Sequence, residues 1–244
     1  MAVSTPLDVV HRGECIAGMA DLPADIADVM IADPPYGLTR APWDISIDLG
    51  AFWAQAERVV KPDGALVVFA SQPFTTKLIA SNLGHYRYSW VWNKRKAGNI
   101  FVGKYQPMKI HEDICVFSRK AHRYFPVMTE REETRTSRNY AVSSLYQTRD
   151  SVERTYTHRY PTSILDFSNA KTRGRINPTQ KPLPLIEYLL NTYSRAGDVV
   201  LDPFMGAFST AIACATLNRR FIGYELNRDQ WTKGYQRYRD HLGG

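Results

Sequence analysis

The sequence predicts an α/β protein with a mostly parallel sheet that helices cover on both faces. Strand-like and helix-like segments alternate along the chain, as in proteins whose parallel strands are joined by crossover helices. The strand-like runs, such as ALVVFA and DVVLD, are short and almost wholly apolar, which is typical of strands buried on both faces. The chain has 244 residues, 44% of them hydrophobic, enough for one sizeable core with room for an insertion.

Seven segments have the composition of strands: residues 7–13, 27–33, 64–70, 86–93, 112–119, 198–202 and 219–225. Five segments have apolar residues at helical spacing: residues 49–60, 74–83, 183–195, 207–217 and 229–241. In the first predicted helix, Phe52, Ala56 and Val59 recur on one face. No helical pattern separates the strands at 86–93 and 112–119, so we expect an antiparallel pair at one end of the sheet.

Residues 119–175 differ from the rest of the chain. They contain twelve basic and six acidic residues, with tyrosines in between and few aliphatic side chains. This excess accounts for most of the net charge of +7. Basic residues interleaved with aromatic ones suit contact with nucleic acid, whereas a mobile, solvated loop is the alternative interpretation. The net charge by itself favours a polyanionic partner no more than it favours simple solubility.

The composition also bounds the class of protein. No apolar run approaches the ~18 residues that a membrane span needs, and the first residues lack the pattern of a signal peptide. The three cysteines lie far apart, without a CxxC or Cys/His cluster. We therefore expect reduced, buried thiols, no metal site, no membrane association and a cytoplasmic location.

The stretch IADPPYG, residues 31–37, places an aspartate at the end of an apolar strand, followed by two prolines and a tyrosine. Aspartate followed by proline is also common turn chemistry. Taken alone, the stretch therefore suits a strand-terminating turn as well as a functional site.

A second candidate site lies near the end of the sequence. VVLDPFMGAFST, residues 199–210, is predicted to be a strand, a glycine-bearing turn and the start of a helix, an arrangement that binds nucleotide-like ligands. Gly206 would let the backbone approach a ligand closely. Glu225 follows nineteen positions later, the spacing of a carboxylate that accepts hydrogen bonds from ribose hydroxyls. The alternative is that Asp202 and Glu225 only cap neighbouring helices.

These motifs occur in a particular order: DPPY early, TQKP in the middle and DPFMGAFST late. In this order the chain resembles the β group of amino-methylating DNA methyltransferases, which use S-adenosylmethionine to methylate N6 of adenine or N4 of cytosine. The similarity covers nearly the whole chain and includes VVHRGECIAGMADLP, WVWNKRKAGN, HEDICVFSRK, YPTSILDFS and NPTQKPLPLIEYLL. The resemblance implies a Rossmann-like methyltransferase fold with a seven-stranded sheet and permuted motif order. It also implies a single domain, 1–244, with a target-recognition region inserted at 119–175.

The resemblance assigns S-adenosylmethionine as the cofactor. It implies that Thr179 and Lys181 lie near the methionine end, Glu225 near the ribose, and Glu14 near the adenine ring. The cofactor-binding residues expected in total are Glu14, Cys15, Thr179, Lys181, Asp202, Pro203, Phe204, Gly206, Ser209, Thr210, Glu225 and Asn227. One departure stands out, because Phe208 replaces the second glycine of the family's loop. If that position requires a positive φ, we expect strain there and an altered loop.

The chemistry of this family gives DPPY a joint explanation. An exocyclic amine is a poor nucleophile, since its lone pair is delocalised into the ring. Acceptors on its N–H bonds, here the Asp33 carboxylate and the Pro34 carbonyl, favour attack, and the carboxylate stabilises the positive charge that develops. Pro34 and Pro35 would make the turn rigid, and Tyr36 would stack on a base flipped out of the duplex.

The expected substrate is double-stranded DNA, with N6 of adenine favoured over N4 of cytosine because DPPY is more usual in adenine enzymes. Candidate DNA-contacting residues are Lys94, Arg95, Lys96, Arg131, Arg135, Arg138, Asn139, Arg149 and Arg154. A non-enzymatic DNA-binding protein on the same fold is the third hypothesis, and Phe208 is its only support. The sequence leaves open the recognition sequence, a homodimer, and the choice between a restriction–modification and a stand-alone enzyme.

Overall fold

The computed structural model describes residues 5–38, 44–98, 100–138, 142–143, 146–147, 153–169, 175–177 and 179–243. The chain divides into two units. The larger comprises Met1–Phe125 and Ser163–Gly244, and the smaller is Pro126–Thr162. Among the described residues no helix is long and apolar enough to cross a membrane.

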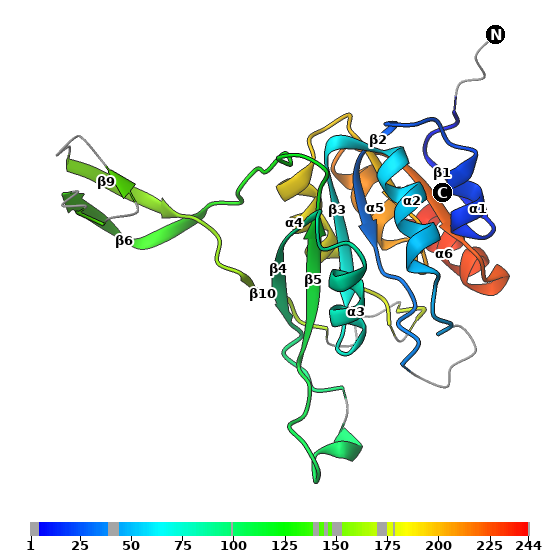
Figure 1. Cartoon of the computed structure of the whole chain (residues 1–244), viewed down its shortest axis with the longest axis horizontal. Coiled ribbons are helices and arrows are strands. Elements are labelled where there is room, and N and C mark those ends of the chain that lie inside the picture. The colour runs from blue at the N-terminus through cyan, green and yellow to red at the C-terminus, as the bar shows by residue number, and fades with distance from the viewer. Residues whose placement is uncertain are drawn as a thin grey trace. The chain divides into compact units, whose positions relative to one another are not determined.

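One eight-stranded sheet forms the centre of the larger unit (Figure 1). Its spatial order is β1 (Val9–Arg12), β12 (Arg220–Glu225), β11 (Val199–Asp202), β2 (Ala27–Ala32), β3 (Val60–Ala70), β5 (His111–Phe117), β4 (Tyr86–Asn93) and β10 (Ile164–Asp166). The five strands from β1 to β3 are mutually parallel. Only β5 runs antiparallel, between β3 and β4. The predicted mostly parallel sheet and its antiparallel pair are therefore confirmed.

The sheet has one strand more than the seven we expected. All seven predicted segments form strands, and the eighth is β10, which pairs in parallel with β4 from Ile164 opposite Val91 to Asp166 opposite Asn93. Three residues are too few to show a periodic pattern, and only Leu165 among them is buried. For this reason no sequence pattern predicted this strand.

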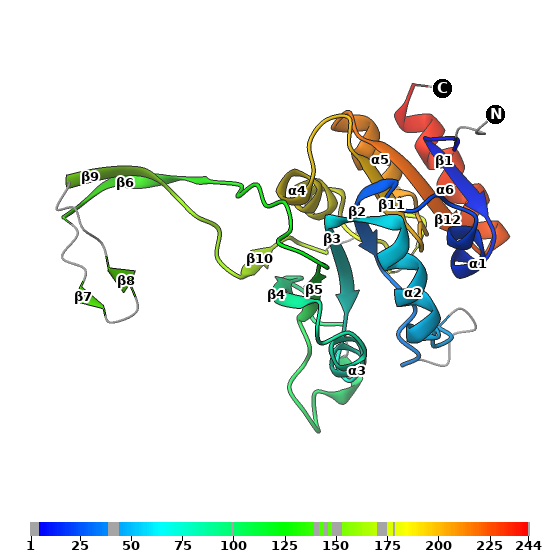
Figure 2. The same cartoon turned by 45° about the horizontal axis from the view of Figure 1, so that its top comes forward.

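Helices cover both faces of the sheet, as predicted (Figure 2). The helices α1 (Cys15–Ala20), α2 (Leu49–Val59) and α3 (Phe74–Ser81) pack on one face. The helices α4 (Leu183–Tyr193), α5 (Ser209–Thr216) and α6 (Arg228–His241) pack on the other. Side chains along β2 alternate between the two, because Val29 and Ile31 belong to one core and Met30 and Ala32 to the other. Of these helices, α1 was not predicted; its six residues are shorter than two turns.

The smaller unit is built from strands that the sequence did not predict. β6 (Thr129–Arg138) pairs antiparallel with β9 (Glu153–Arg159), and β7 (Val142–Ser143) pairs with β8 (Tyr146–Gln147). The sequence of β6, TEREETRTSR, has no alternation of apolar and polar residues. An exposed hairpin buries neither face in a core, so the usual pattern of a strand is missing.

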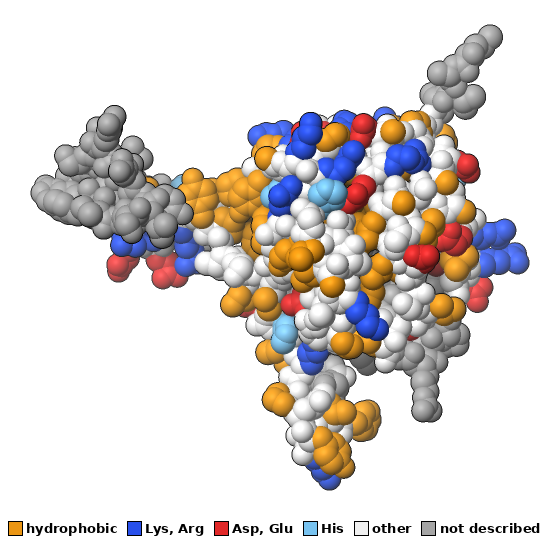
Figure 3. Space-filling model, in the orientation of Figure 1, with side chains coloured by type: hydrophobic (Ala, Val, Ile, Leu, Met, Phe, Trp, Pro, Cys, Tyr) orange, Lys and Arg blue, Asp and Glu red, His pale blue; other side chains and the backbone are white. Residues whose placement is uncertain are grey.

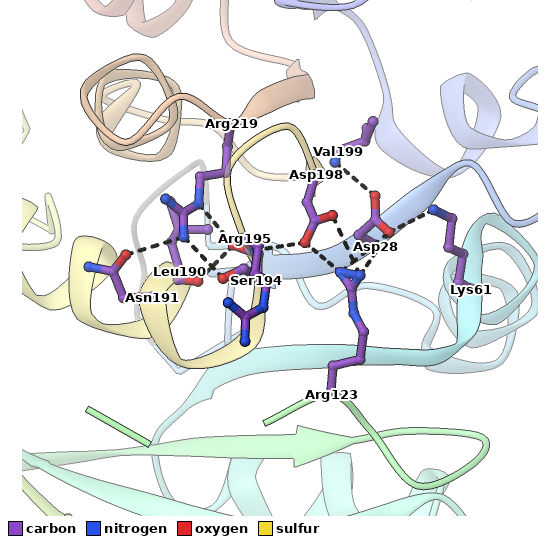
Figure 4. Close-up of polar contacts among 10 residues, drawn as sticks. All are labelled: Asp28, Lys61, Arg123, Leu190, Asn191, Ser194, Arg195, Asp198, Val199 and Arg219. Carbon is purple, nitrogen blue, oxygen red and sulfur yellow. Dashed lines mark hydrogen bonds and ion pairs between the residues drawn. The ribbon is translucent and has the colours of Figure 1, made fainter. Parts of the chain in front are cut away.

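At the amino ends of the parallel strands, a group of charged residues joins neighbouring segments (Figure 4). Asp28, near the start of β2, is only 5% exposed. Its carboxylate accepts hydrogen bonds from Lys61 Nζ at 2.6 Å and from the backbone N–H of Val199 at 2.9 Å. Arg123 lies 3.4 Å from Asp28 and also pairs with Asp198. These contacts fix the chain that leaves β5 to the base of the sheet.

Candidate active site at the carboxyl edge of the sheet

The two motifs singled out from the sequence meet at the carboxyl edge of the sheet. Asp33 directly follows β2, and Asp202 ends the neighbouring strand β11. Parallel strands place their carboxyl ends at the same edge, where α/β folds bind ligands. One cavity there is lined by residues from both motifs and from TQKP, among them Asp33, Phe69, Thr179, Lys181, Asp202, Phe204, Gly206, Ser209 and Thr210.

Asp33 is held from two sides. The Tyr36 hydroxyl donates to Asp33 Oδ1 at 3.0 Å, and Lys181 Nζ donates to Oδ2 at 2.7 Å. The side chain keeps 29% exposure. Burial raises the pKa of Asp33, although Lys181 acts in the opposite direction. The pKa of Tyr36 is raised by burial and by Asp33, so its hydroxyl remains a protonated donor at neutral pH.

The turn after Asp33 is fixed by a residue that the sequence did not single out. Asp44, which is buried, accepts hydrogen bonds from the backbone N–H groups of Gly37 at 2.7 Å and Leu38 at 2.9 Å. Gly37 has a φ of +66°, a conformation that favours glycine. The Tyr36 ring stacks on Phe74 with centroids 5.2 Å apart. Asp44 and Phe74 thus hold the turn and the aromatic ring in place.

Behind Asp33 lies a chain of alternating charges. Lys181 is 10% exposed and reaches Glu112 Oε2 at 3.5 Å, while Lys94 Nζ donates to Glu112 Oε1 at 3.0 Å. Burial alone would raise the pKa of Glu112, but Lys181 and Lys94 outweigh it, and the pKa is lowered. Burial alone would lower the pKa of Lys181, but Asp33 and Glu112 outweigh it, and the pKa is raised. In their ionised forms the four groups carry two positive and two negative charges that balance.

Sequence reasoning gave Glu112 no role. An acidic residue at the start of an otherwise apolar strand was the available signal, since a buried charge needs a partner. Lys94 was predicted to contact DNA phosphate, but it is 14% exposed and paired with Glu112. Arg95 makes two bonds to Asp166, at 2.7 and 2.8 Å, and Lys96 is exposed.

The loop after β11 donates backbone hydrogen bonds to two carboxylates, those of Asp202 and Glu225. Asp202 is 5% exposed and accepts from the backbone N–H of Phe204 at 2.9 Å. Burial raises the pKa of Asp202 to about 7. Glu225 accepts from the N–H of Gly206 at 2.8 Å and from that of Asn227 at 2.7 Å, and burial raises its pKa. Since Gly206 has a φ of +49°, a glycine suits this turn.

The helix-capping alternative for these carboxylates is wrong. The N-cap of α6 is Asn227, whose side chain accepts from Gln230 N–H at 3.0 Å. The N-cap of α5 is Phe208, without a side-chain hydrogen bond. Asp202 and Glu225 instead fix the loop that lines the cavity.

Phe208 adopts the left-handed conformation, with φ +60° and ψ +26°. This costs about 1–2 kcal/mol for a residue with a Cβ. The ring is fully buried between α5 and α6 and packs edge-on to Trp231. A Cβ atom at position 234 would lie only 2.1 Å from this ring, so Gly234 makes room for it. Burial of such a side chain stabilises by about 1.5–3 kcal/mol and offsets the strain. The ring points into the core, and Phe208 does not line the cavity.

Glu14 and Cys15 lie apart from the cavity. Glu14 caps α1 by accepting from the N–H groups of Ile16 and Ala17, and these bonds keep its pKa lowered although burial opposes this. It lines a separate hollow beside His11 and Tyr224. Burial raises the pKa of the Cys15 thiol to about 12. All three cysteines are free and buried, as predicted.

The predicted DNA-reading residues belong to the smaller unit. Arg131 and Arg135 lie on β6, and Arg131 Nε donates to the carbonyl of His158 at 3.2 Å. Arg138 and Arg154 lie on β6 and β9. The remaining two, Asn139 and Arg149, lie outside the described residues.

Comparison with known proteins agrees with this geometry. The family model described as DNA methylase, of the N6/N4 type, matches residues 27–233. The DNA adenine methyltransferase YhdJ of Escherichia coli (strain K12) is 30% identical over 247 aligned residues, covering 94% of this chain and 81% of that protein. The crystal structure of the M1.HpyAVI–SAM complex is similar in fold, with a TM-score of 0.64, 20% identity, and coverage of 93% of this chain and 97% of that one.

The PvuII DNA methyltransferase, described as cytosine-N4-specific, has the same fold with a TM-score of 0.67 and 12% identity, covering 98% of this chain and 93% of that one. The family match spans most of the chain, and YhdJ is matched over most of its length. The chain therefore belongs to the N6/N4 family of S-adenosylmethionine-dependent DNA methyltransferases.

Proposed function

We propose that the chain transfers the methyl group of S-adenosylmethionine to the exocyclic N6 of an adenine flipped out of duplex DNA. The observation that carries this proposal is the shared cavity at the carboxyl edge. Its lining includes the Asp33 carboxylate and the loop of Asp202 and Gly206. An acceptor for the amine hydrogens thus lies beside the residues that suit the methyl donor.

The residues that line the cavity fit the cofactor. S-adenosylmethionine, when bound, supplies a methyl group on a positively charged sulfur. Asp33 and Asp202 both line the cavity and offer negative charge, while Gly206 leaves room for close backbone approach. The hydroxyl side chains of Ser209 and Thr210 line the same wall. Lys181 and Thr179 stand at the end of the cavity formed by TQKP.

Asp33 has the geometry of the residue that prepares the amine. Its carboxylate accepts an N–H of the target base and stabilises the positive charge that develops on nitrogen as the N–C bond forms and the C–S bond breaks. The released proton passes to this carboxylate or to water. Lys181, 2.7 Å away, favours the ionised form of Asp33. Tyr36 fixes Oδ1 and presents its ring for stacking.

Adenine is the base we favour, because the sequence has DPPY and because YhdJ is described as an adenine methyltransferase. N4-methylation of cytosine remains the second candidate, since the PvuII enzyme shares the fold. The decayed, non-enzymatic alternative loses its one support, because the Phe208 ring lies in the core.

We further propose that the smaller unit reads the DNA sequence. Its strands β6 and β9 carry Arg131, Arg135, Arg138 and Arg154, and arginine is the commonest reader of guanine. We also propose that the enzyme acts on DNA in the cytoplasm.

The sequence leaves a homodimer open. Light scattering of the purified chain distinguishes a monomer from a homodimer.

Methyl transfer to mixed-sequence duplex DNA, followed by mass spectrometry of the hydrolysed nucleosides, tests the function. N6-methyladenine supports the proposal, and N4-methylcytosine as the only product corrects the base. Asp33→Ala should abolish transfer while binding of S-adenosylmethionine survives. Asp63→Ala, at an exposed position near the start of β3, serves as the matched control. Normal transfer by Asp33→Ala would contradict the role of Asp33.

A further inference from the structure

The segment between β4 and β5, residues 94–110, forms a projection at the carboxyl edge of the sheet (Figure 1). We call it the β4–β5 loop. Its base continues the strand pairing, since Lys94 N–H donates to Ile110 O at 2.8 Å and Gly98 N–H donates to Lys109 O at 3.2 Å. Its end carries a short 3-10 helix, Ile100–Val102.

The end of the loop is an ordered turn with its own hydrogen bonds. Gly103 N–H donates to Ile100 O at 3.2 Å, and Tyr105 N–H donates to Val102 O at 2.9 Å. The shape of this turn is therefore set before any partner is met, which lowers the entropy cost of binding.

The turn presents large apolar side chains to solvent. Phe101 is 96% exposed, Tyr105 87% and Ile100 69%. Figure 3 shows hydrophobic side chains together with basic ones on this projection. Neighbouring exposed apolar groups of this kind mark interaction sites. The core of the larger unit gains nothing from these side chains.

The charge of the loop indicates what it binds. Residues 94–110 contain five basic residues and no acidic residue. Lys94 and Arg95 are already paired with Glu112 and Asp166, whereas Lys96 and Lys104 are exposed. Two copies of such a loop would repel each other, and lysine is depleted from protein interfaces. A dense line of phosphates is the complementary partner.

The loop is joined directly to the site that holds Asp33. Lys94 donates to Glu112, which Lys181 connects to Asp33. On the other arm, Lys109 Nζ donates to Ser71 Oγ at 2.5 Å, just after β3. The loop thus begins and ends beside the place where a flipped base would enter.

We propose that the β4–β5 loop docks on duplex DNA beside the flipped adenine, with Lys96 and Lys104 on phosphates and the Phe101 ring in the space that the base leaves. This inference rests on the proposed function. A flipped base leaves a gap in the stack, and proteins that distort DNA fill such gaps with apolar side chains. Phe101, at the tip of the turn, is the most exposed large apolar side chain of the larger unit's described residues.

The test compares Phe101→Ala with Leu83→Ala, an equally apolar change at a side chain 67% exposed, at the far end of β4. Methylation rates are measured on a duplex whose target base is correctly paired and on one whose target base faces an abasic position. Phe101→Ala should be about tenfold slower on the paired duplex. The defect should largely disappear on the abasic duplex, where flipping is easier. Leu83→Ala should match the parent on both.

A second measurement addresses the lysines. Changing Lys96 and Lys104 together to glutamine should reduce the slope of log affinity against log salt by about 1–2. Equal rates for Phe101→Ala and the parent on the paired duplex would overturn the insertion of Phe101. A change of oligomeric state in Phe101→Ala would assign the loop to a second copy of the chain and overturn the proposal. If the parent itself methylates no DNA, the proposed function has failed, and this inference fails with it.

Discussion

Two aspartates on one stretch of chain, Asp28 and Asp33, lie at opposite ends of the parallel strands of the same sheet. Both are paired with a lysine. Asp28 is 5% exposed and accepts from Lys61 and the Val199 backbone, with Arg123 beside it (Figure 4). Asp33 is 29% exposed at its side chain and lines a cavity.

The difference between these carboxylates separates a structural from a chemical role. The partners of Asp28 come from three segments of the chain, so its charge joins them together. The partners of Asp33 leave it open to the cavity, where an amine can approach. Burial raises the pKa of Asp33, which improves its capacity to accept a proton near neutral pH. The surroundings, more than the residue type, decide the role.

The largest expected effect tests the chemical role of Asp33. Asp33→Asn keeps the shape of the side chain but removes the charge, so methyl transfer should fall by about 10³-fold. Lys181 keeps its contact with Glu112 in this variant, so we expect the protein to remain folded, and thermal unfolding checks this. A rate within a few-fold of the parent would contradict the assignment.

The second effect sharpens the role of the cation beside Asp33. Lys181→Met removes the positive charge that opposes the raised pKa of Asp33. The pKa of Asp33 should rise further, so the acidic limb of the pH–rate profile should move to higher pH, with a rate loss of about 10²-fold at neutral pH. Lys61→Met, at the 42% exposed partner of Asp28, is the control and should leave the pH profile unshifted. An unchanged pH–rate profile for Lys181→Met would contradict this role of Lys181.

The third effect tests the structural role of Asp28. Asp28→Asn leaves Lys61 and Arg123 without their shared carboxylate and should lower the free energy of unfolding by about 2 kcal/mol. Denaturant titration followed by tryptophan fluorescence measures this change. The folded variant should still methylate DNA at nearly the parental rate. An unaltered unfolding midpoint would show that the cluster contributes nothing to stability.

The smallest effect concerns the other carboxylate of the cavity. The pKa of Asp202 is raised to about 7 by burial, so its ionised fraction grows as the pH rises through neutrality. A cationic ligand favours the ionised form, and affinity for S-adenosylmethionine should therefore increase about tenfold from pH 6 to pH 8. S-adenosylhomocysteine, which lacks the sulfonium charge, should show a weaker dependence by calorimetry. Parallel pH curves for the two ligands would count against this explanation.

The fold could be predicted largely from the sequence because buried strands and amphipathic helices leave periodic patterns. The five predicted helices and seven predicted strands all occur. The elements that were missed are α1, β10, the 3-10 helix Ile100–Val102 and the four strands from β6 to β9. They are short or, like the β6–β9 pair, belong to an exposed hairpin. Their positions depend on tertiary pairing, such as that of β10 with β4, which local patterns do not encode.

The site was predicted less completely. DPPY, TQKP and the loop of Gly206 are contiguous motifs, and the structure gathers them around one cavity. Glu112 acts on the site from a segment distant in sequence. Asp44 lies only seven residues beyond Gly37, but its bonds to the turn are seen only in the folded chain. The left-handed conformation of Phe208 was foreseen as a source of strain. The gap above Gly234 that accepts its ring was not.

The most direct test of the central claim quantifies methylated nucleosides formed by the parent, Asp33→Asn and Asp28→Asn at equal concentrations of folded protein. We expect N6-methyladenine from the parent and from Asp28→Asn, and about 10³-fold less from Asp33→Asn, although all three bind S-adenosylmethionine. N6-methyladenine from Asp33→Asn at the parental level would show that the Asp33 carboxylate does not carry the reaction.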